Sequence, residues 1–151
     1  MESSDIKIDK DGIWYYRGAH MFRQDILCIF FEHLHMDDDG RYFIELNGEI
    51  YYLDVEDTPF VVTAVYKKDS PGCGHEQIEI LLNDGCTEIL DLNSLSVGSD
   101  NVIYCRIKGG SFPARFVRKS YYQLAEFIEE DDGEATFCIA LNNQMYLIKN
   151  S

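Results

Sequence analysis

The stretch Val55-Glu56-Asp57-Thr58-Pro59-Phe60-Val61-Val62 lies in the middle of a 151-residue chain and decides how the rest is organised. Proline fixes its own φ and disfavours the helical region for the residue before it, so Thr58 is expected to be extended. The apolar run from Phe60 onward is typical of a buried strand. We therefore predict an acidic corner at Glu56 and Asp57, held at a strand edge, that leads directly into the core.

Composition places the chain among ordinary globular proteins. Apolar residues make up 46% and charged residues 26% of the sequence, unlike the composition of disordered segments. No run of eighteen apolar residues occurs, which excludes a transmembrane helix. The first residues lack the basic and apolar segments of a signal peptide, so we expect the protein in the cytoplasm.

The cysteines and histidines predict neither disulfides nor a metal site. Five cysteines form no C-x-x-C pair, and thiols in apolar runs pack as small hydrophobic groups. His33 and His35 are two positions apart, unlike the i, i+4 pair of a helical zinc site. We expect no metal and no cofactor, and we interpret the loop with Cys73 and His75 as solvent-exposed rather than nucleophilic. The cysteines, expected to be reduced and mostly buried, are Cys28, Cys73, Cys86, Cys105 and Cys138.

The charge is strongly negative overall but uneven along the chain. A net charge of −14 repels polyanions, which argues against nucleic acid and anionic membranes as partners. Residues 101–125, however, contain no acidic residue. This basic segment favours binding of a small, discrete anion. Its cations are Arg106, Lys108, Arg115, Arg118 and Lys119.

Turn signals and apolar spacing predict an α+β fold with mostly antiparallel sheets. Asp11-Gly12, Asn47-Gly48 and Asn83-Asp84-Gly85 lie between strand-like runs, and such pairs favour tight hairpins. Apolar residues at three-to-four spacing predict two helices. The first begins near Gln24 and includes Leu34, and the second covers residues 116–129.

The two halves of the chain repeat one order of signals. A strand, a glycine, an arginine, a helix, an Asp-Gly turn and a hairpin follow one another twice, which predicts a duplicated strand–helix–hairpin unit. Common turn residues would produce the same pattern by chance, and this is the alternative. We place an N-terminal lobe at residues 1–67 and a C-terminal lobe at 68–151, packed tightly together. Gly18, Gly40 and Asn47 correspond to Gly110, Gly133 and Asn142, at shifts of 92, 93 and 95 residues.

The acidic corner and the basic segment are expected to form two walls of one cleft between the lobes. On the expected second helix, Arg115, Arg118 and Tyr122 fall on one strip, where guanidinium groups grip a phosphate or carboxylate and the phenol stacks on a planar base. Purely structural ion pairs between these arginines and the corner are the alternative. The expected ligand-binding set is Trp14 (stacking), Arg23, Glu56, Asp57, Pro59, Phe60, Arg106, Arg115, Arg118 and Tyr122.

The sequence carries no recognisable catalytic set. Walker A loops, dinucleotide-binding fingerprints and nucleophile elbows are all missing, so we assign no catalytic residue and do not expect an enzyme. Our first hypothesis is a ligand-sensing or signalling module that binds a nucleotide-like or phosphorylated small molecule in the cleft. The second is a protein–protein adaptor whose ion pairs between the lobes are purely structural.

Residues of both halves resemble an uncharacterised bacterial family, the domain-of-unknown-function family 1285. The resemblance implies a duplicated α+β core whose C-terminal half is superficially like a pleckstrin-homology fold, and a cleft site for a nucleotide-like ligand in signalling. The loop with Cys73 and the strong acidity depart from the family pattern. The matching residues are Trp14-Tyr15, Gly18, Arg23, Gly40-Arg41-Tyr42 and residues 55–61, then Ala114-Arg115-Phe116, Arg118, Tyr121-Tyr122 and Leu124-Ala125-Glu126.

Overall fold

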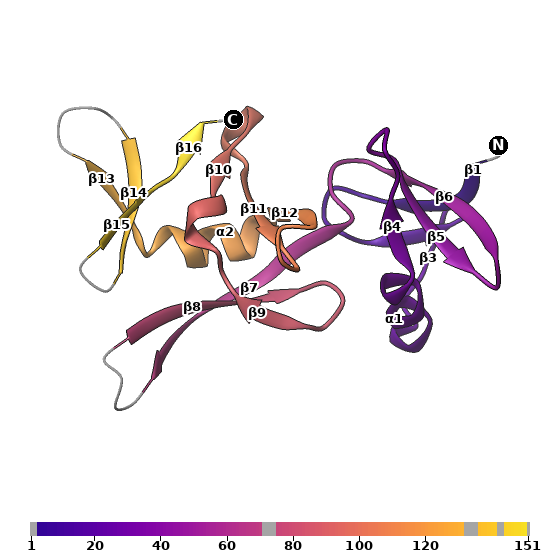
Figure 1. Cartoon of the computed structure of the whole chain (residues 1–151), viewed down its shortest axis with the longest axis horizontal. Helices are drawn as coiled ribbons and strands as arrows, with labels where there is room; N and C mark the ends of the chain where they lie inside the picture. The colour runs from indigo at the N-terminus through magenta and orange to yellow at the C-terminus, as the bar shows by residue number, and fades with distance from the viewer. Residues whose placement is uncertain (1–2, 71–74, 132–135, 142–143, 151) are drawn as a thin grey trace. The chain divides into compact units, whose positions relative to one another are not determined.

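The computed structural model describes residues 3–70, 75–131, 136–141 and 144–150, and shows an α+β fold (Figure 1). The chain divides into two compact units, Met1–Pro59 and Phe60–Ser151. Pro59 therefore ends unit 1, directly after the acidic corner. The boundary lies eight residues before the one that we placed between residues 67 and 68, because strand β7 (Phe60–Ser70) continues without a break through that position.

Unit 1 is built on a six-stranded sheet in the order β3-β2-β1-β6-β5-β4. Strands β1 and β6 pair in parallel, and every other neighbouring pair in this sheet is antiparallel. The Asp11-Gly12 and Asn47-Gly48 hairpins are confirmed, since β1 pairs with β2 and β5 with β6. The elements are β1 (Ser3–Ile8), β2 (Trp14–Tyr16), β3 (Ala19–His20), α1 (Gln24–Glu32), β4 (Leu34–Met36), β5 (Tyr42–Leu46) and β6 (Glu49–Val55).

The core of unit 1 forms around Trp14, the single tryptophan of the chain. Its side chain is 1% exposed. The indole centroid lies 5.9 Å from the ring of Phe30 and 5.0 Å from that of Phe31, so β2 packs against α1 through aromatic contacts. Ile8 and Ile44 complete the buried layer from β1 and β5.

Unit 2 contains a seven-stranded sheet, in the order β16-β10-β11-β12-β7-β8-β9, and a separate three-stranded meander, β13-β14-β15. Within the seven-stranded sheet, β7 is parallel to β12 and β10 is parallel to β16, and the remaining pairs are antiparallel. The strands not yet bounded are β8 (His75–Leu82), β9 (Thr87–Ile89), β10 (Ser96–Val97), β11 (Ile103–Ile107), β12 (Phe112–Phe116), β13 (Ile128–Asp131), β14 (Thr136–Leu141), β15 (Gln144–Leu147) and β16 (Lys149–Asn150).

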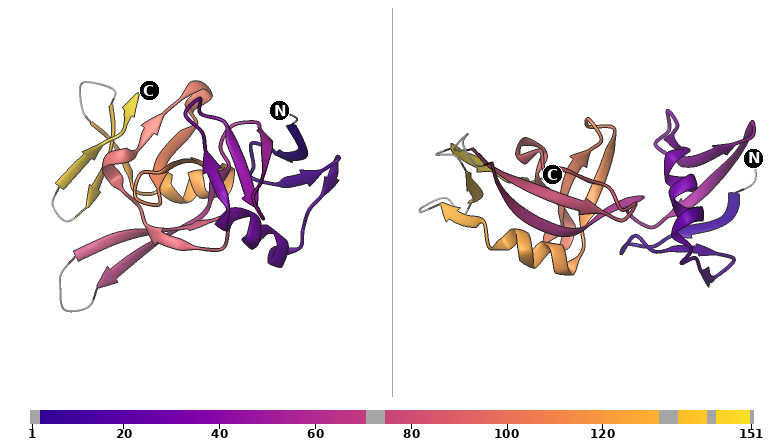
Figure 2. Two further views of the ribbon diagram at one scale, coloured as in Figure 1. Left: turned by 45° about the vertical axis from the view of Figure 1, so that its right-hand side comes forward. Right: turned by 90° about the horizontal axis from the view of Figure 1, so that it is seen from below.

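Helix α2 (Arg118–Ala125) packs against β7 (Figures 1 and 2). The hydroxyl of the fully buried Ser120 lies 2.5 Å from the carbonyl oxygen of Val62, and the amide oxygen of Gln123 accepts a 2.8 Å hydrogen bond from the backbone N–H of Val65. Leu124 is also fully buried. The superficial pleckstrin-homology likeness of this half stays a prediction.

The internal duplication is confirmed by the order of elements. A helix is followed by a three-stranded antiparallel meander in each unit, α1-β4-β5-β6 in the first and α2-β13-β14-β15 in the second. Both helices are followed by a strand after two residues or fewer. The first residues of the paired elements are Gln24 and Arg118, Leu34 and Ile128, Tyr42 and Thr136, Glu49 and Gln144, at shifts of 94, 94, 94 and 95 residues. Gly133 and Asn142, which we expected in the second set of turns, lie outside the described residues.

Both helices are shorter than their apolar spacing predicted. Helix α1 ends at Glu32 and α2 at Ala125, whereas Leu34 begins β4 and Ile128 begins β13. Leu34 is buried and Ile128 half-buried, so the apolar spacing continues across a helix-to-strand junction and mimics one longer helix.

The Asn47-Gly48 turn offers a test of local strain. Both residues have positive φ, at 53° and 81°, as a type I′ turn requires. No atom lies within 4 Å of a Cβ built on Gly48, so Gly48→Ala is expected to cost about 1–2 kcal/mol through backbone strain alone. Urea unfolding measures this cost. The control Asn47→Gly should leave stability nearly unchanged, and an equal loss in both variants would contradict the assignment.

The cysteines divide into exposed and buried thiols. Cys28 and Cys86 are exposed and Cys105 and Cys138 are buried, and none of these four forms a disulfide within the described residues. Cys73 lies outside the described residues. Burial raises the pKa of Cys105 to about 12. In a Cys73→Ser variant at mildly alkaline pH, a thiol reagent is expected to modify two cysteines rapidly and the other two only after denaturation, as counted by mass spectrometry. Rapid modification of Cys105 in the folded protein would contradict this.

Candidate functional site

The basic segment of residues 101–125 is distributed over three elements, β11, β12 and α2. Arg106 lies on β11, Arg115 on β12, and Arg118 is the first residue of α2. The expectation that Arg115, Arg118 and Tyr122 share one helical strip is therefore wrong for Arg115. The helix does not begin until Arg118, because Val117 has an extended backbone and β12 continues through Phe116.

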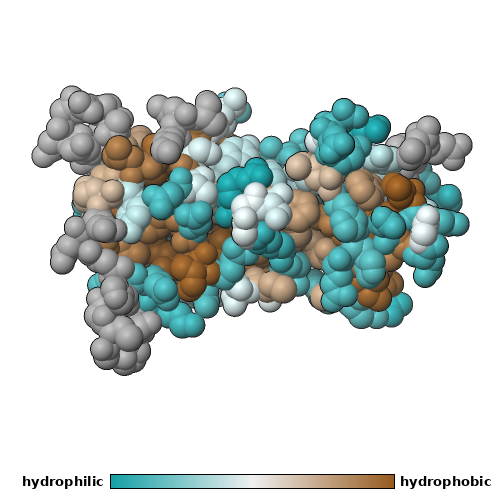
Figure 3. Space-filling view, in the orientation of Figure 1, coloured by the Kyte–Doolittle hydropathy of each residue, from teal (hydrophilic) through white to brown (hydrophobic). Residues whose placement is uncertain are grey.

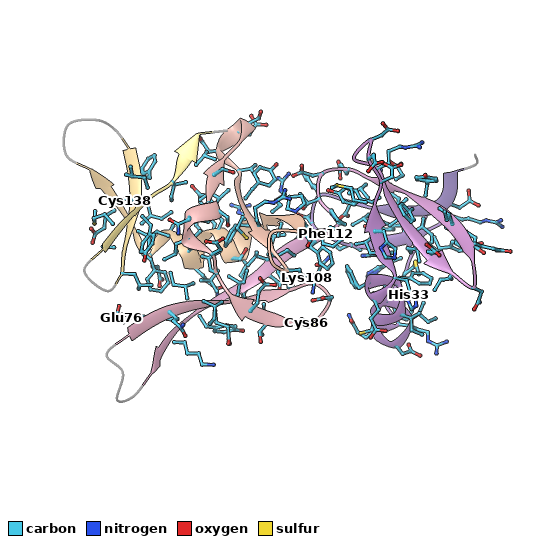
Figure 4. The ribbon with its side chains drawn as sticks, in the orientation of Figure 1. His33, Glu76, Cys86, Lys108, Phe112 and Cys138 are labelled. Atoms are coloured by element: carbon cyan, nitrogen blue, oxygen red, sulfur yellow. The ribbon has the colours of Figure 1, made fainter. Side chains whose placement is uncertain are left out.

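Arg106 and Lys108 make contacts within unit 2 that hold the turn between β11 and β12 in place. The Arg106 guanidinium donates to the carbonyl oxygen of Gly110 at 2.8 Å. The Lys108 ammonium lies 3.0 Å from a carboxylate oxygen of Asp84 and 5.1 Å from the ring centroid of Phe60. Phe60 is fully buried and also packs on Phe112, which Figure 4 labels together with Lys108. Arg106, Lys108 and Phe60 thus have clear structural roles.

Arg118 and Tyr122 are exposed neighbours on α2. The guanidinium carbon of Arg118 lies 5.9 Å from the ring centroid of Tyr122, whose side chain is 57% exposed. No side chain caps the helix, since the N-cap residue is Val117. Within the part of the chain that the structure describes, no ion pair involves Arg118. A solvent-facing guanidinium and an aromatic ring are therefore held together beside uncapped backbone N–H groups.

Arg115 occupies a more enclosed position. It is half-buried on β12, in register with Tyr104 of β11 on one side and Val61 of β7 on the other. Lys119, in the first turn of α2, is exposed. Arg115, Arg118 and Lys119 thus lie within five consecutive residues at the junction of β12 and α2, the most basic part of the segment.

The acidic corner is anchored within unit 1. The backbone N–H of Glu56 donates to the carbonyl oxygen of Ile8 at 2.9 Å, and the Glu56 carboxylate accepts a 2.7 Å hydrogen bond from the backbone N–H of Lys10. Asp57 is half-buried and Pro59 is buried. The carboxylate of Glu56 therefore organises the turn after β1, and its expected role in orienting arginines stays a prediction, as does that of Asp57.

Two further expected site residues have structural surroundings in unit 1. Trp14 is a core residue, and an indole enclosed by Phe30 and Phe31 presents no ring face to a ligand from solvent, which corrects the expectation that it stacks. Arg23 is exposed at the N-cap of α1, where its guanidinium lies 2.8 Å from a carboxylate oxygen of Asp25.

A cavity of about 450 Å³ lies beside α2 in unit 2. Among its lining residues, Asn101 and Tyr121 have polar side chains and the other six have apolar ones. The sequence does not predict this cavity, because its lining residues come from separate segments. Tyr121, Ala125 and Ile128 follow one another at helical spacing, and the one signal is the polar hydroxyl of Tyr121 in that otherwise apolar series. The apolar wall consists of Val97, Ile103, Ala125, Ile128, Phe137 and Ile148.

Among the residues that the structure describes, no three histidine, cysteine, aspartate or glutamate side chains come together as metal ligands do. None of the described helices has the length and apolar character needed to cross a membrane.

Two crystal structures of DUF1285 family proteins resemble this chain. The protein from Silicibacter pomeroyi DSS-3 matches with a TM-score of 0.76, over 97% of this chain and 80% of its own, at 20% sequence identity. The protein from Shewanella baltica OS155 matches with a TM-score of 0.65, over 82% of this chain and 91% of its own, also at 20% identity. The chain has a DUF1285-like fold. The resemblance stated from the sequence is thereby confirmed.

At 20% identity, the likeness to the DUF1285 proteins concerns the fold alone. No family model and no curated protein matches the sequence.

Proposed function

We propose that this protein is a non-enzymatic ligand-sensing module that binds a small organic anion at the start of α2 in unit 2. The single observation that carries the proposal is Arg118, which is exposed, lies against the ring of Tyr122, and has no ion-pair partner among the described residues. A phosphorylated or nucleotide-like molecule would present the charge and the planar group that these two side chains bind.

Electrostatics at the helix terminus supports an anion there. The N-terminal end of a helix carries a partial positive charge, and cationic side chains in the first turn raise it further, at a cost of about 0.3–1 kcal/mol each. Arg118 and Lys119 both occupy the first turn of α2, and no acidic residue does. A bound anion would remove this repulsion and accept hydrogen bonds from uncapped N–H groups.

The thiols support a cytoplasmic location for the proposed module. Cys28, Cys86, Cys105 and Cys138 form no disulfide among the described residues, and Cys28 and Cys86 are exposed. Exposed free thiols persist in reducing compartments, whereas extracellular proteins oxidise or lose them.

A thermal-shift screen tests the proposed function. Phosphate, nucleotides, sugar phosphates and small carboxylates would be titrated against the full chain. A ligand at one hundred times its dissociation constant is expected to stabilise the folded state by about 2.7 kcal/mol. Isothermal titration with the same compound should give one site per chain. A panel without any stabilising anion would contradict the proposal.

The adaptor alternative also has a specific observation in its favour. Met145 and Leu147 of β15 are 57% and 55% exposed, and their partners Ala140 and Cys138 place them on one face of the meander. Figure 3 shows apolar surface on unit 2 in one view. A protein partner that is lost on Met145→Ser and Leu147→Ser but retained by an Arg118 variant would favour the adaptor.

A further inference from the structure

The cavity of unit 2 and the anion-binding residues share one face of α2. Tyr121 and Ala125 line the cavity, and both lie three or four positions from Arg118 or Tyr122. Residues at these spacings are neighbours on a helix surface. At 100° per residue, all four side chains fall within about 100° of the helix circumference. Arg118 does not line the cavity itself, but it lies one helical turn before Tyr121 on the same side of α2 as the lining residues.

The cavity has the size and chemistry of a ligand pocket. Its volume of about 450 Å³ lies in the ordinary range for small-molecule sites. An apolar cavity of roughly 150 Å³ in another protein binds benzene, so a cavity this large has room for a longer alkyl chain or a bicyclic ring. Six of the eight lining residues have apolar side chains, and displacing weakly held water from beside them by an apolar group is favourable.

We infer that this cavity binds the apolar body of an amphipathic organic anion, a medium-length alkyl or aromatic carboxylate or phosphate, whose charged group lies at Arg118. The inference rests on the proposed function for the charged group, and it deepens that function by naming the ligand class. The phenol of Tyr121 and the amide of Asn101 line the cavity. Each can form a hydrogen bond with a polar substituent on the apolar body of the ligand.

The arrangement divides the work of recognition between two parts of α2. The first turn selects for charge through Arg118, and the next turn selects for an apolar body through Ala125 and the side chains across the cavity, Ile103 and Ile148. Affinity should therefore rise with the apolar area of the ligand until the cavity is filled. Each added methylene is expected to tighten binding about threefold to fourfold.

The test uses octanoate, hexanoate, acetate and the uncharged octanol as probes, with the full chain in isothermal titration. Octanoate is expected to bind at one site, more tightly than hexanoate, and at least about 100-fold more tightly than acetate. Ala125→Trp fills the cavity and should abolish octanoate binding. Ala140→Trp is the matched control, since Ala140 is exposed and alternates on β14 with the cavity-lining Phe137. It should bind like the wild type.

A further variant separates this inference from the proposed function. Arg118→Gln is expected to weaken octanoate about tenfold and leave octanol unchanged. If Arg118→Gln has no effect while Ala125→Trp still abolishes binding, the cavity assignment stands and the anion assignment falls. If all chain lengths bind alike, or Ala125→Trp binds octanoate normally, the cavity assignment is overturned. Far-ultraviolet circular dichroism checks that Ala125→Trp folds. If it does not fold, Ala125→Leu replaces it, and the same loss of octanoate binding is expected.

Discussion

Replacing Arg118 by alanine is expected to remove most of the thermal stabilisation that a phosphate-bearing ligand gives, and to leave the melting temperature of the free protein unchanged or slightly raised. The guanidinium supplies the charge-assisted hydrogen bonds, each worth about 1.5–3 kcal/mol, so its loss should weaken binding by a factor of roughly 10–100. The free protein loses only a solvent-exposed cation that opposes the dipole of α2.

A matched control for Arg118→Ala is available in unit 1. Arg23 is also an exposed arginine at the start of a helix, but it pairs with Asp25 of the same helix. Arg23→Ala should therefore leave ligand-induced stabilisation intact. Arg118→Lys keeps the charge but not the planar fork, and an intermediate affinity is expected. Equal stabilisation of the wild type and Arg118→Ala by the same ligand, measured side by side, would end the assignment of Arg118.

Replacing Trp14 by alanine is expected to destabilise unit 1 by about 3–5 kcal/mol, the range for deleting a large buried aromatic side chain. The side chain is 1% exposed and contacts Phe30 and Phe31, so its removal leaves a cavity between α1 and β2. Trp14→Phe retains aromatic packing and should cost less than half as much. Urea unfolding followed by circular dichroism measures both variants.

The same pair of variants separates the core role of Trp14 from the ligand-stacking role that the sequence favoured. If Trp14 is a core residue, Trp14→Phe should bind the ligand with unchanged affinity. Trp14→Ala should then show a loss of folding stability rather than a specific loss of ligand affinity. Unchanged stability in Trp14→Ala, together with a weaker ligand, would restore the stacking role. The indole Nε1 is buried without a hydrogen-bond partner among the described atoms, which further limits the cost of changing to phenylalanine.

Much of the fold follows from short-range signals in the sequence. Asn47-Gly48 predicts its turn because both residues need positive φ, and Pro59 predicts the corner because it restricts its own backbone and that of Thr58. These constraints act between adjacent residues and need no knowledge of the tertiary structure. The duplication was visible for the same reason, since turn and helix signals recur at a nearly constant distance.

The predictions from sequence that are wrong concern residues whose secondary structure is determined by tertiary packing. Leu34 and Ile128 continue a helical spacing but begin strands, because their side chains fill positions in sheets that distant segments create. Arg115 has the helical spacing of Arg118 and Tyr122 but lies on β12, which pairs with β11 and β7. The cavity could not be predicted, since Asn101, Ile103 and Phe137 meet α2 only after the sheets have formed.

The location of Trp14 has one experimental consequence of its own. Trp14 is the sole tryptophan and is buried in unit 1. Its fluorescence therefore reports the unfolding of residues 1–59 and does not report the unfolding of unit 2. Coincident fluorescence and ellipticity transitions would mean that the two units lose their structure cooperatively, whereas separated midpoints would reveal an intermediate with one unit folded.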